Sequence, residues 1–145
     1  MLLYEITRKK EYQDAVRAGG LLYAATGTLT NGQRVIIIMP EFDTAQEYVQ
    51  AFIINHEEGH LLYGDDDEYI ADKHAVSIVG EKCAVHALLW LFKDSKGKAS
   101  YLARLEAINR IINIKYGRKV FNINRNQILG REKISLFYFI LNMFY

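Results

Sequence analysis

The sequence predicts an α+β fold in which a small N-terminal β-hairpin packs on a series of helices. Two observations lead to this prediction. Two short runs rich in apolar and β-branched residues flank an Asn-Gly turn, and after them apolar residues recur at helical spacing through most of the chain. With 145 residues, half of them hydrophobic, the chain is long enough to bury a core, so we expect residues 1–145 to form a single domain.

The first predicted elements are a polar helix over residues 8–18 and a hairpin. The hairpin strands are expected over residues 21–29 and 33–39, with Thr-Asn-Gly at residues 30–32 between them. Asn-Gly readily supplies the two positive φ angles that a type I′ turn requires. We therefore expect a type I′ hairpin.

A long helix is expected from Ala45 to Tyr63. Thr44 and Glu47 fit a Thr-x-x-Glu capping box, and Gly64 stands where the helical pattern ends. Further helices are predicted over residues 68–79, 81–92 and 100–114, with residues 93–98 as a loop. The last helix should bury the apolar stripe Leu102, Leu105, Ile108, Ile111 and Ile112.

Composition excludes several classes of protein. One proline, one cysteine and about a quarter of charged residues are not typical of collagen, a disordered chain or a disulfide scaffold. No apolar run approaches the roughly 18 residues of a membrane span, and the N-terminus lacks the order of a signal peptide. We therefore expect a cytoplasmic protein without a membrane segment.

Charge is distributed unevenly along the chain. Residues 1–72 carry 5 Lys/Arg and 13 Asp/Glu, a net charge of −8, whereas residues 73–145 carry 13 and 4, a net charge of +9. Two interpretations are open. The halves pack against each other and neutralise their fields, or the basic half contacts nucleic acid or an acidic partner.

The segment that indicates chemistry is His56-Glu57-x-x-His60. Histidines four apart on a helix lie one turn above each other on one face, so both imidazoles can reach one Zn²⁺ ion. Glu57 lies about 100° around the helix, where a general base can take a proton from water at the metal. A chance match on a solvated helix is the alternative. Gly59 is unfavourable inside a helix, which suggests close approach of another backbone.

A third metal ligand is expected from the next helix. Glu68 and Asp72 are four apart, so Glu68 can bind zinc while Asp72 accepts the far N–H of a bound imidazole. Ala71 leaves room for the two helices to pack closely. An aspartate of residues 65–67, or Asp72 itself, is the alternative third ligand, although residues 65–67 are expected to form a solvated turn.

Other candidate side chains rank below these. His74 should point away from the metal into a surface or packing role, and His86 is expected to be a hydrogen-bonded core residue rather than an oxyanion donor. Tyr63 and Tyr69 are the tyrosines nearest the motif, and each is more typical of packing than of an electrophile.

The pattern His56-Glu57-x-x-His60 followed by Glu68-x-x-Ala71-Asp72 resembles the gluzincin metallopeptidases, specifically the HtpX-like and minigluzincin branch. The resemblance covers residues 24–79 and takes in Ala-Ala-Thr-Gly at 24–27, which is similar to an element of the family's active-site strand. It departs from the HtpX-like enzymes, which have membrane helices. The gap between His60 and Glu68 is also short for a substrate-binding insertion.

The resemblance implies a compact zincin-like domain that holds one Zn²⁺ per chain and hydrolyses peptide bonds as an endopeptidase. His56, His60 and Glu68 would be the metal ligands, Glu57 the catalytic base and Asp72 the outer partner of a ligand. The substrate would be a peptide or protein bound along the hairpin edge.

The competing hypothesis is a non-hydrolytic structural or interaction protein, for example a virus-particle component, that keeps the zinc scaffold and contacts nucleic acid or neighbouring subunits through its basic half. The basic and apolar tail over residues 117–145 also leaves two interpretations. It completes the core or an oligomer interface, or it covers the substrate groove and keeps the enzyme latent.

Overall fold

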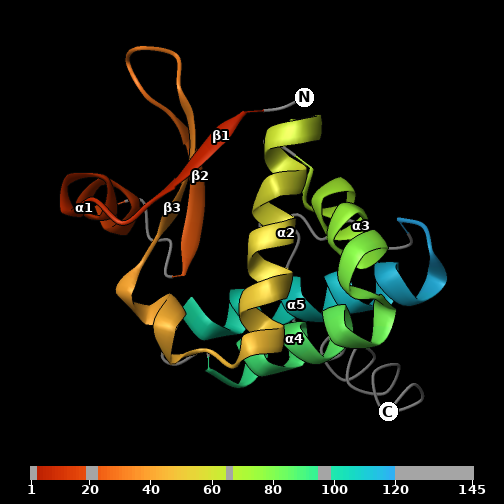
Figure 1. The fold of residues 1–145 in the computed structure, drawn as a ribbon. Helices are drawn as coiled ribbons and strands as arrows, with labels where there is room; N and C mark the ends of the chain where they lie inside the picture. The colour runs from red at the N-terminus through yellow and green to blue at the C-terminus, as the bar shows by residue number, and fades with distance from the viewer. Residues whose placement is uncertain (1–2, 19–22, 65–66, 95–98, 120–145) are drawn as a thin grey trace.

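In the described part of the chain, three short strands and one helix come first, and the elements from Pro40 to Tyr116 are all helices (Figure 1). The structure, a computed structural model, describes residues 3–18, 23–64, 67–94 and 99–119, without the side chains of residues 92–105. In order, its elements are β1 (Tyr4–Thr7), α1 (Lys10–Ala18), β2 (Ala24–Thr28), β3 (Arg34–Ile38), the 3₁₀ helix η1 (Pro40–Thr44), α2 (Glu47–Tyr63), α3 (Glu68–Val79), α4 (Glu81–Asp94) and α5 (Ala99–Tyr116). The predicted α+β class is confirmed.

The strands form one sheet in the order β1-β3-β2. β2 and β3 are antiparallel, as expected for a hairpin, and β1 runs parallel to β3 with Tyr4 opposite Arg34. β1 was not expected from the sequence. Its four residues pair with β3, which is distant in the chain, so no turn next to β1 indicates a strand there.

The predicted type I′ turn is wrong. Gly32 has φ +87°, but no non-glycine residue among those described has a positive φ, so Asn31 does not adopt the first left-handed position. Gly32 N–H donates to Leu29 O at 2.9 Å, and Leu29 N–H donates to Gln33 O at 2.9 Å. This is the three-residue loop with glycine at its left-handed position. The Asn31 side chain supports the loop by accepting the Gln33 N–H at 2.9 Å.

The predicted capping box is also wrong. Pro40 starts η1, and the Thr44 hydroxyl donates to Glu41 O at 2.6 Å within that turn. The backbone then extends through Ala45, and α2 begins at Glu47 with Gln46 as an N-cap that makes no side-chain hydrogen bond. Thr44 therefore stabilises the turn that Pro40 begins, instead of capping α2 as the sequence pattern predicts.

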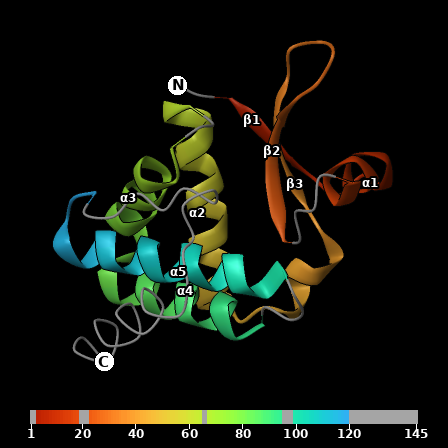
Figure 2. The same ribbon diagram turned by 180° about the vertical axis from the view of Figure 1, so that it is seen from behind.

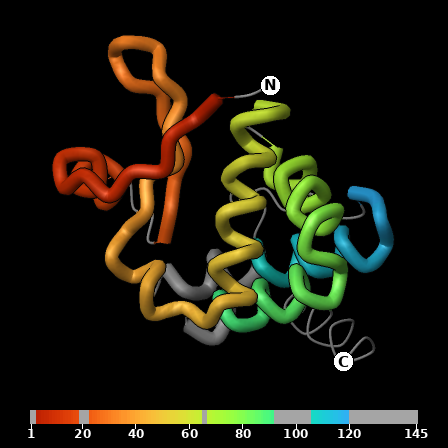
Figure 3. Tube along the Cα trace, in the orientation of Figure 1, coloured from red at the N-terminus to blue at the C-terminus, as the bar shows by residue number. Residues whose placement is uncertain are grey.

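The sheet packs on the helices through one face and on α1 through the other (Figures 1 and 2). The larger core lies between Ala24, Ile36 and Ile38 of the sheet and helices α2, α4 and α5. α2 runs between the sheet and α3, as the tube in Figure 3 shows, and contacts both. Ile108, Ile111 and Ile112 of α5 are buried as predicted, whereas the side chains of Leu102 and Leu105 are outside the described part.

The charged halves of the chain are joined by ion pairs. Arg110 pairs with Asp72, and Lys119 lies 3.5 Å from Asp67. These contacts agree with the interpretation that the two halves partly neutralise each other. Of the tail over residues 117–145, only residues 117–119 belong to the described part of the chain. Among the described helices, none has the length and hydropathy needed to cross a bilayer.

Candidate metal centre

The site depends on close packing of α2 against α3. Gly59 lies against Ala71, so that a Cβ added at Gly59 would come within 2.8 Å of Ala71 Cα and 3.0 Å of Ala71 O. A larger residue at either position would push the helices apart. The expected reason for a glycine inside this helix, close approach of another backbone, is confirmed.

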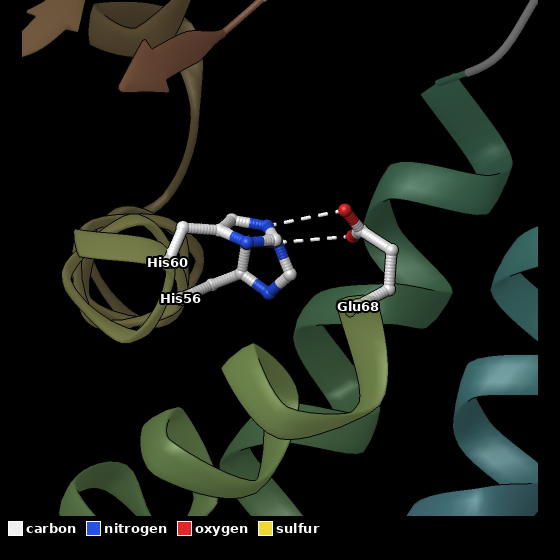
Figure 4. A group of neighbouring side chains, drawn as sticks. All are labelled: His56, His60 and Glu68. Carbon is white, nitrogen blue, oxygen red and sulfur yellow. Dashed lines mark hydrogen bonds and ion pairs between the residues drawn. The ribbon is translucent and has the colours of Figure 1, made fainter. Parts of the chain in front are cut away.

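This packing brings His56 and His60 of α2 to Glu68 at the first turn of α3 (Figure 4). His56 Nε2 lies 3.1 Å from Glu68 Oε2, and His60 Nε2 lies 3.1 Å from Glu68 Oε1. The two Nε2 atoms are 3.0 Å apart. One atom from each of the three side chains therefore points at the same small volume, and this group could hold a metal ion.

The second nitrogen of each imidazole has its own partner. His56 Nδ1 lies 2.7 Å from Asp72 Oδ1, and His60 Nδ1 lies 3.3 Å from the carbonyl oxygen of Gly64. Both partners are acceptors, so each Nδ1 carries a proton and each Nε2 is the nitrogen that could bind a cation. Arg110 Nη2 also lies near His56 Nδ1, at 3.3 Å, farther away than Asp72. The two Nε2 atoms and a carboxylate then face one another, an arrangement that favours positive charge between them.

The donor set fits Zn²⁺ in chemistry and spacing. Two imidazoles and one carboxylate are a common set of three protein ligands in catalytic zinc sites. Bonds of about 2.0–2.1 Å in a tetrahedron hold neighbouring ligand atoms about 3.3 Å apart, close to the observed 3.0–3.1 Å. The imidazoles are buried, whereas the Glu68 side chain is 56% exposed, so solvent reaches the group from the side of Glu68.

Electrostatics of the metal-free site show how strongly it attracts positive charge. Burial and Arg110 lower the pKa of His56, but hydrogen bonds to Asp72 and Glu68 outweigh them and raise it to about 9. Burial opposes ionisation of Glu68, yet the two imidazoles hold its pKa well below its ordinary value. These groups therefore favour positive charge at the place where they meet.

Glu57 is half-buried beside these ligands. Burial raises the pKa of its carboxyl group, and the nearby charges of His56, His60 and Arg110 oppose that shift. A carboxylate whose pKa is raised toward neutrality is a stronger proton acceptor than an exposed one.

Asp72 is 1% exposed and accepts hydrogen bonds from two sides. Arg110 of α5 donates through Nε to Oδ2 at 2.8 Å and through Nη2 to Oδ1 at 2.7 Å, in addition to the contact with His56. The Arg110 guanidinium also lies over the Phe52 ring, 5.9 Å from its centroid. Arg110 was not among the residues expected at the site. Its signal in the sequence is a single charge among the isoleucines of residues 108–114, which indicates a buried ion pair but does not identify the partner.

Of the alternative third ligands, Asp72 and Asp67 lie in the described part of the chain, where their carboxylates make other contacts. Asp72 contacts His56 only through Nδ1, on the far side of the ring. Asp67 is the N-cap of α3, where its Oδ1 accepts the N–H of Tyr69 at 3.0 Å, so it is not the purely solvated residue that was expected. Asp65 and Asp66 lie outside the described residues.

The two remaining histidines do not belong to the group formed by His56, His60 and Glu68. His74 contacts Glu58 Oε1 at 2.9 Å, in keeping with its expected packing role. His86 is exposed on α4, so its expected place in the core is wrong; Val85 and Ala87 on either side of it take the buried positions. Tyr63 is 63% exposed and packs edge-on against His74.

Comparison of the chain with protein-family models, curated proteins and solved structures gave no match.

Proposed function

We propose that this protein is a gluzincin-like, zinc-dependent endopeptidase with Glu57 as its catalytic base. The observation that carries the proposal is the convergence of His56 Nε2, His60 Nε2 and the Glu68 carboxylate within 3.1 Å of one another. Three ligands with an open fourth position are typical of catalytic zinc sites, whereas structural sites are closed by four protein ligands.

A bound zinc ion supplies Lewis acidity, which polarises a carbonyl group and lowers the pKa of water. The Glu57 carboxylate accepts the proton that water loses as its oxygen adds to the scissile carbonyl carbon. Glu57 then returns that proton to the amide nitrogen as the C–N bond breaks. Asp72 keeps the proton of His56 on Nδ1, so that Nε2 stays free to bind the ion.

The sheet offers a place for the substrate backbone. β2 is at one end of the strand order and packs on α2, the helix that carries two of the three ligands. An extended peptide can add to the edge of β2 by main-chain hydrogen bonds, without a deep side-chain pocket. This mode of binding favours peptides or unfolded proteins over folded substrates.

Replacement of Glu57 by glutamine tests the proposal. The amide has nearly the same shape as the carboxylate but does not accept the proton, so cleavage of an unfolded protein should fall by about 10²–10⁴-fold at unchanged zinc content. Glu47→Gln is the matched control, because Glu47 is an exposed carboxylate in the first turn of the same helix.

Cleavage by Glu57→Gln at the wild-type rate would show that Glu57 is not the base. A zinc-loaded wild-type protein that cleaves no unfolded protein or peptide would instead favour the non-hydrolytic scaffold.

A further inference from the structure

A second hydrogen-bonded group lies on the face of α2 opposite the metal ligands. The Tyr4 hydroxyl of β1 donates to Glu58 Oε2 at 2.5 Å, and Glu58 Oε1 lies 2.9 Å from His74 Nε2 of α3. Glu58 lies about 200° around α2 from His56, so it faces away from the metal. We call Tyr4, Glu58 and His74 the rear bracket.

The rear bracket links the sheet to α2 at the end of the sheet where no covalent connection joins them. One end of the sheet continues from β3 through η1 into the N-terminus of α2. The other end, where Tyr4 is opposite Arg34 and Arg34 is opposite Thr28, lies beside the C-terminal half of α2 (Figure 1). His56 and His60 belong to that same half. The bracket therefore acts at the level of the metal ligands.

The metal ligands are also held by contacts that do not involve the sheet. The close contact of Gly59 with Ala71 fixes α2 against α3, and Arg110 fixes Asp72 from α5. A change in the rear bracket should thus move the sheet more than it moves the ligands. The backbone hydrogen bonds of the sheet would transmit such a movement from β1 through β3 to β2, because the three strands are paired in that order.

We propose that Tyr4 is a positioning residue, which acts through Glu58 and His74 to set the distance between β2 and the metal centre and so the affinity for an extended peptide. The substrate part of this inference rests on the proposed function. The hydroxyl makes the link, while the ring packs on the main core.

Tyr4→Phe removes the hydroxyl and keeps the ring. We expect unchanged zinc content, a KM for peptide raised by about 3–10-fold and a kcat within about twofold of wild type, because binding is weakened equally in the ground state and the transition state. Backbone amide hydrogen exchange in β1 and β2 should become faster, with no change in α2. Tyr12→Phe is the control, since the Tyr12 ring packs on the other face of the sheet and its hydroxyl has no hydrogen-bond partner among the described residues.

A double-mutant cycle with Glu58→Ala tests whether Tyr4 acts through its hydrogen bond to Glu58. Tyr4→Phe should have no further effect on KM or on exchange once Glu58 is absent, because both changes break the same link. Additive effects, or an unchanged KM in Tyr4→Phe, would overturn the positioning role. Unchanged exchange in β1 and β2 would overturn the bracket itself. A wild type without peptidase activity would refute the proposed function and the substrate role together, and exchange would then decide the bracket alone.

Discussion

Arg110 and Asp72 form a two-point ion pair between α5 and α3, with N···O distances of 2.8 Å and 2.7 Å. The same Asp72 carboxylate reaches His56, so a helix near the end of the described chain supports a ligand of the candidate metal site. Burial alone would raise the pKa of Asp72, but Arg110 and His56 hold it below its ordinary value. Asp72 is therefore an anion inside the protein, and both of its oxygens are used.

Asp72→Ala is expected to weaken zinc binding without abolishing it. The substitution removes the acceptor that holds the His56 proton on Nδ1, and outer partners of this kind typically contribute about 10–100-fold in metal affinity. Zinc titration against a competing chelator measures the change. Complete loss of zinc would instead make Asp72 a direct ligand and remove Glu68 from that role.

Arg110→Met is expected to destabilise the fold by about 3–5 kcal/mol, because it leaves the buried Asp72 carboxylate without its cation. Asp72→Ala leaves Arg110 uncompensated in the same way. The double variant removes both charges, so its free energy of unfolding should exceed the value expected if the two losses were additive. Urea denaturation of zinc-free protein measures all three variants. Strict additivity would contradict the coupling of these residues.

Gly59→Ala should lower the free energy of unfolding, although alanine is the better helix former by about 1 kcal/mol. The new Cβ would meet Ala71 Cα at 2.8 Å, and overpacking against backbone typically costs about 1–3 kcal/mol. Ala51→Gly, at an exposed site of the same helix, measures how much helix propensity alone changes the free energy of unfolding. A Gly59→Ala variant more stable than wild type would show that the helices separate at little cost.

Zinc binding should release at least one proton at neutral pH. The pKa of metal-free His56 is raised to about 9, so the imidazole is charged at pH 7 and must lose a proton to bind the ion. The extra stability of the protonated site is fully present below pH 6.5 and is lost as the pH rises through 9. Apparent zinc affinity should thus increase about tenfold from pH 7 to 8 and less steeply as the pH approaches 9.

Calorimetric titration with zinc in buffers of different ionisation enthalpy measures the released protons. A heat of binding that is the same in all buffers would contradict a charged His56 in the metal-free protein.

Local patterns predicted the helices and the hairpin. The range of α3 matches the prediction because Gly64, Asp67 and Gly80 bound it within the sequence itself. The type I′ turn and the capping box were wrong because other local contacts form instead: the Asn31 side chain accepts the Gln33 N–H within the loop, and Pro40 starts a separate turn that contains Thr44. β1 depends on pairing with a distant strand, which no local pattern records.

In the site, too, residues that are close together in the sequence could be predicted, whereas contacts between residues far apart in the sequence could not. His56, His60 and Glu68 follow from helical periodicity over a short stretch, and the structure brings their ligand atoms together. Arg110 is 38 residues from Asp72, and Tyr4 is 54 residues from Glu58. Their contacts depend on how the helices and the sheet pack, so sequence spacing does not reveal them.

In the proposed function, one zinc ion held by His56, His60 and Glu68 is required for peptide hydrolysis. Hydrolysis of an unfolded protein can be measured against the amount of bound zinc, after removal of metal with a chelator and stepwise return of zinc. The rate should rise in proportion to bound zinc and level off at one ion per chain. His60→Ala should bind none, whereas the exposed His86→Ala should behave as wild type. Hydrolysis that persists without zinc, or a wild-type protein that binds no zinc, would contradict the proposed function.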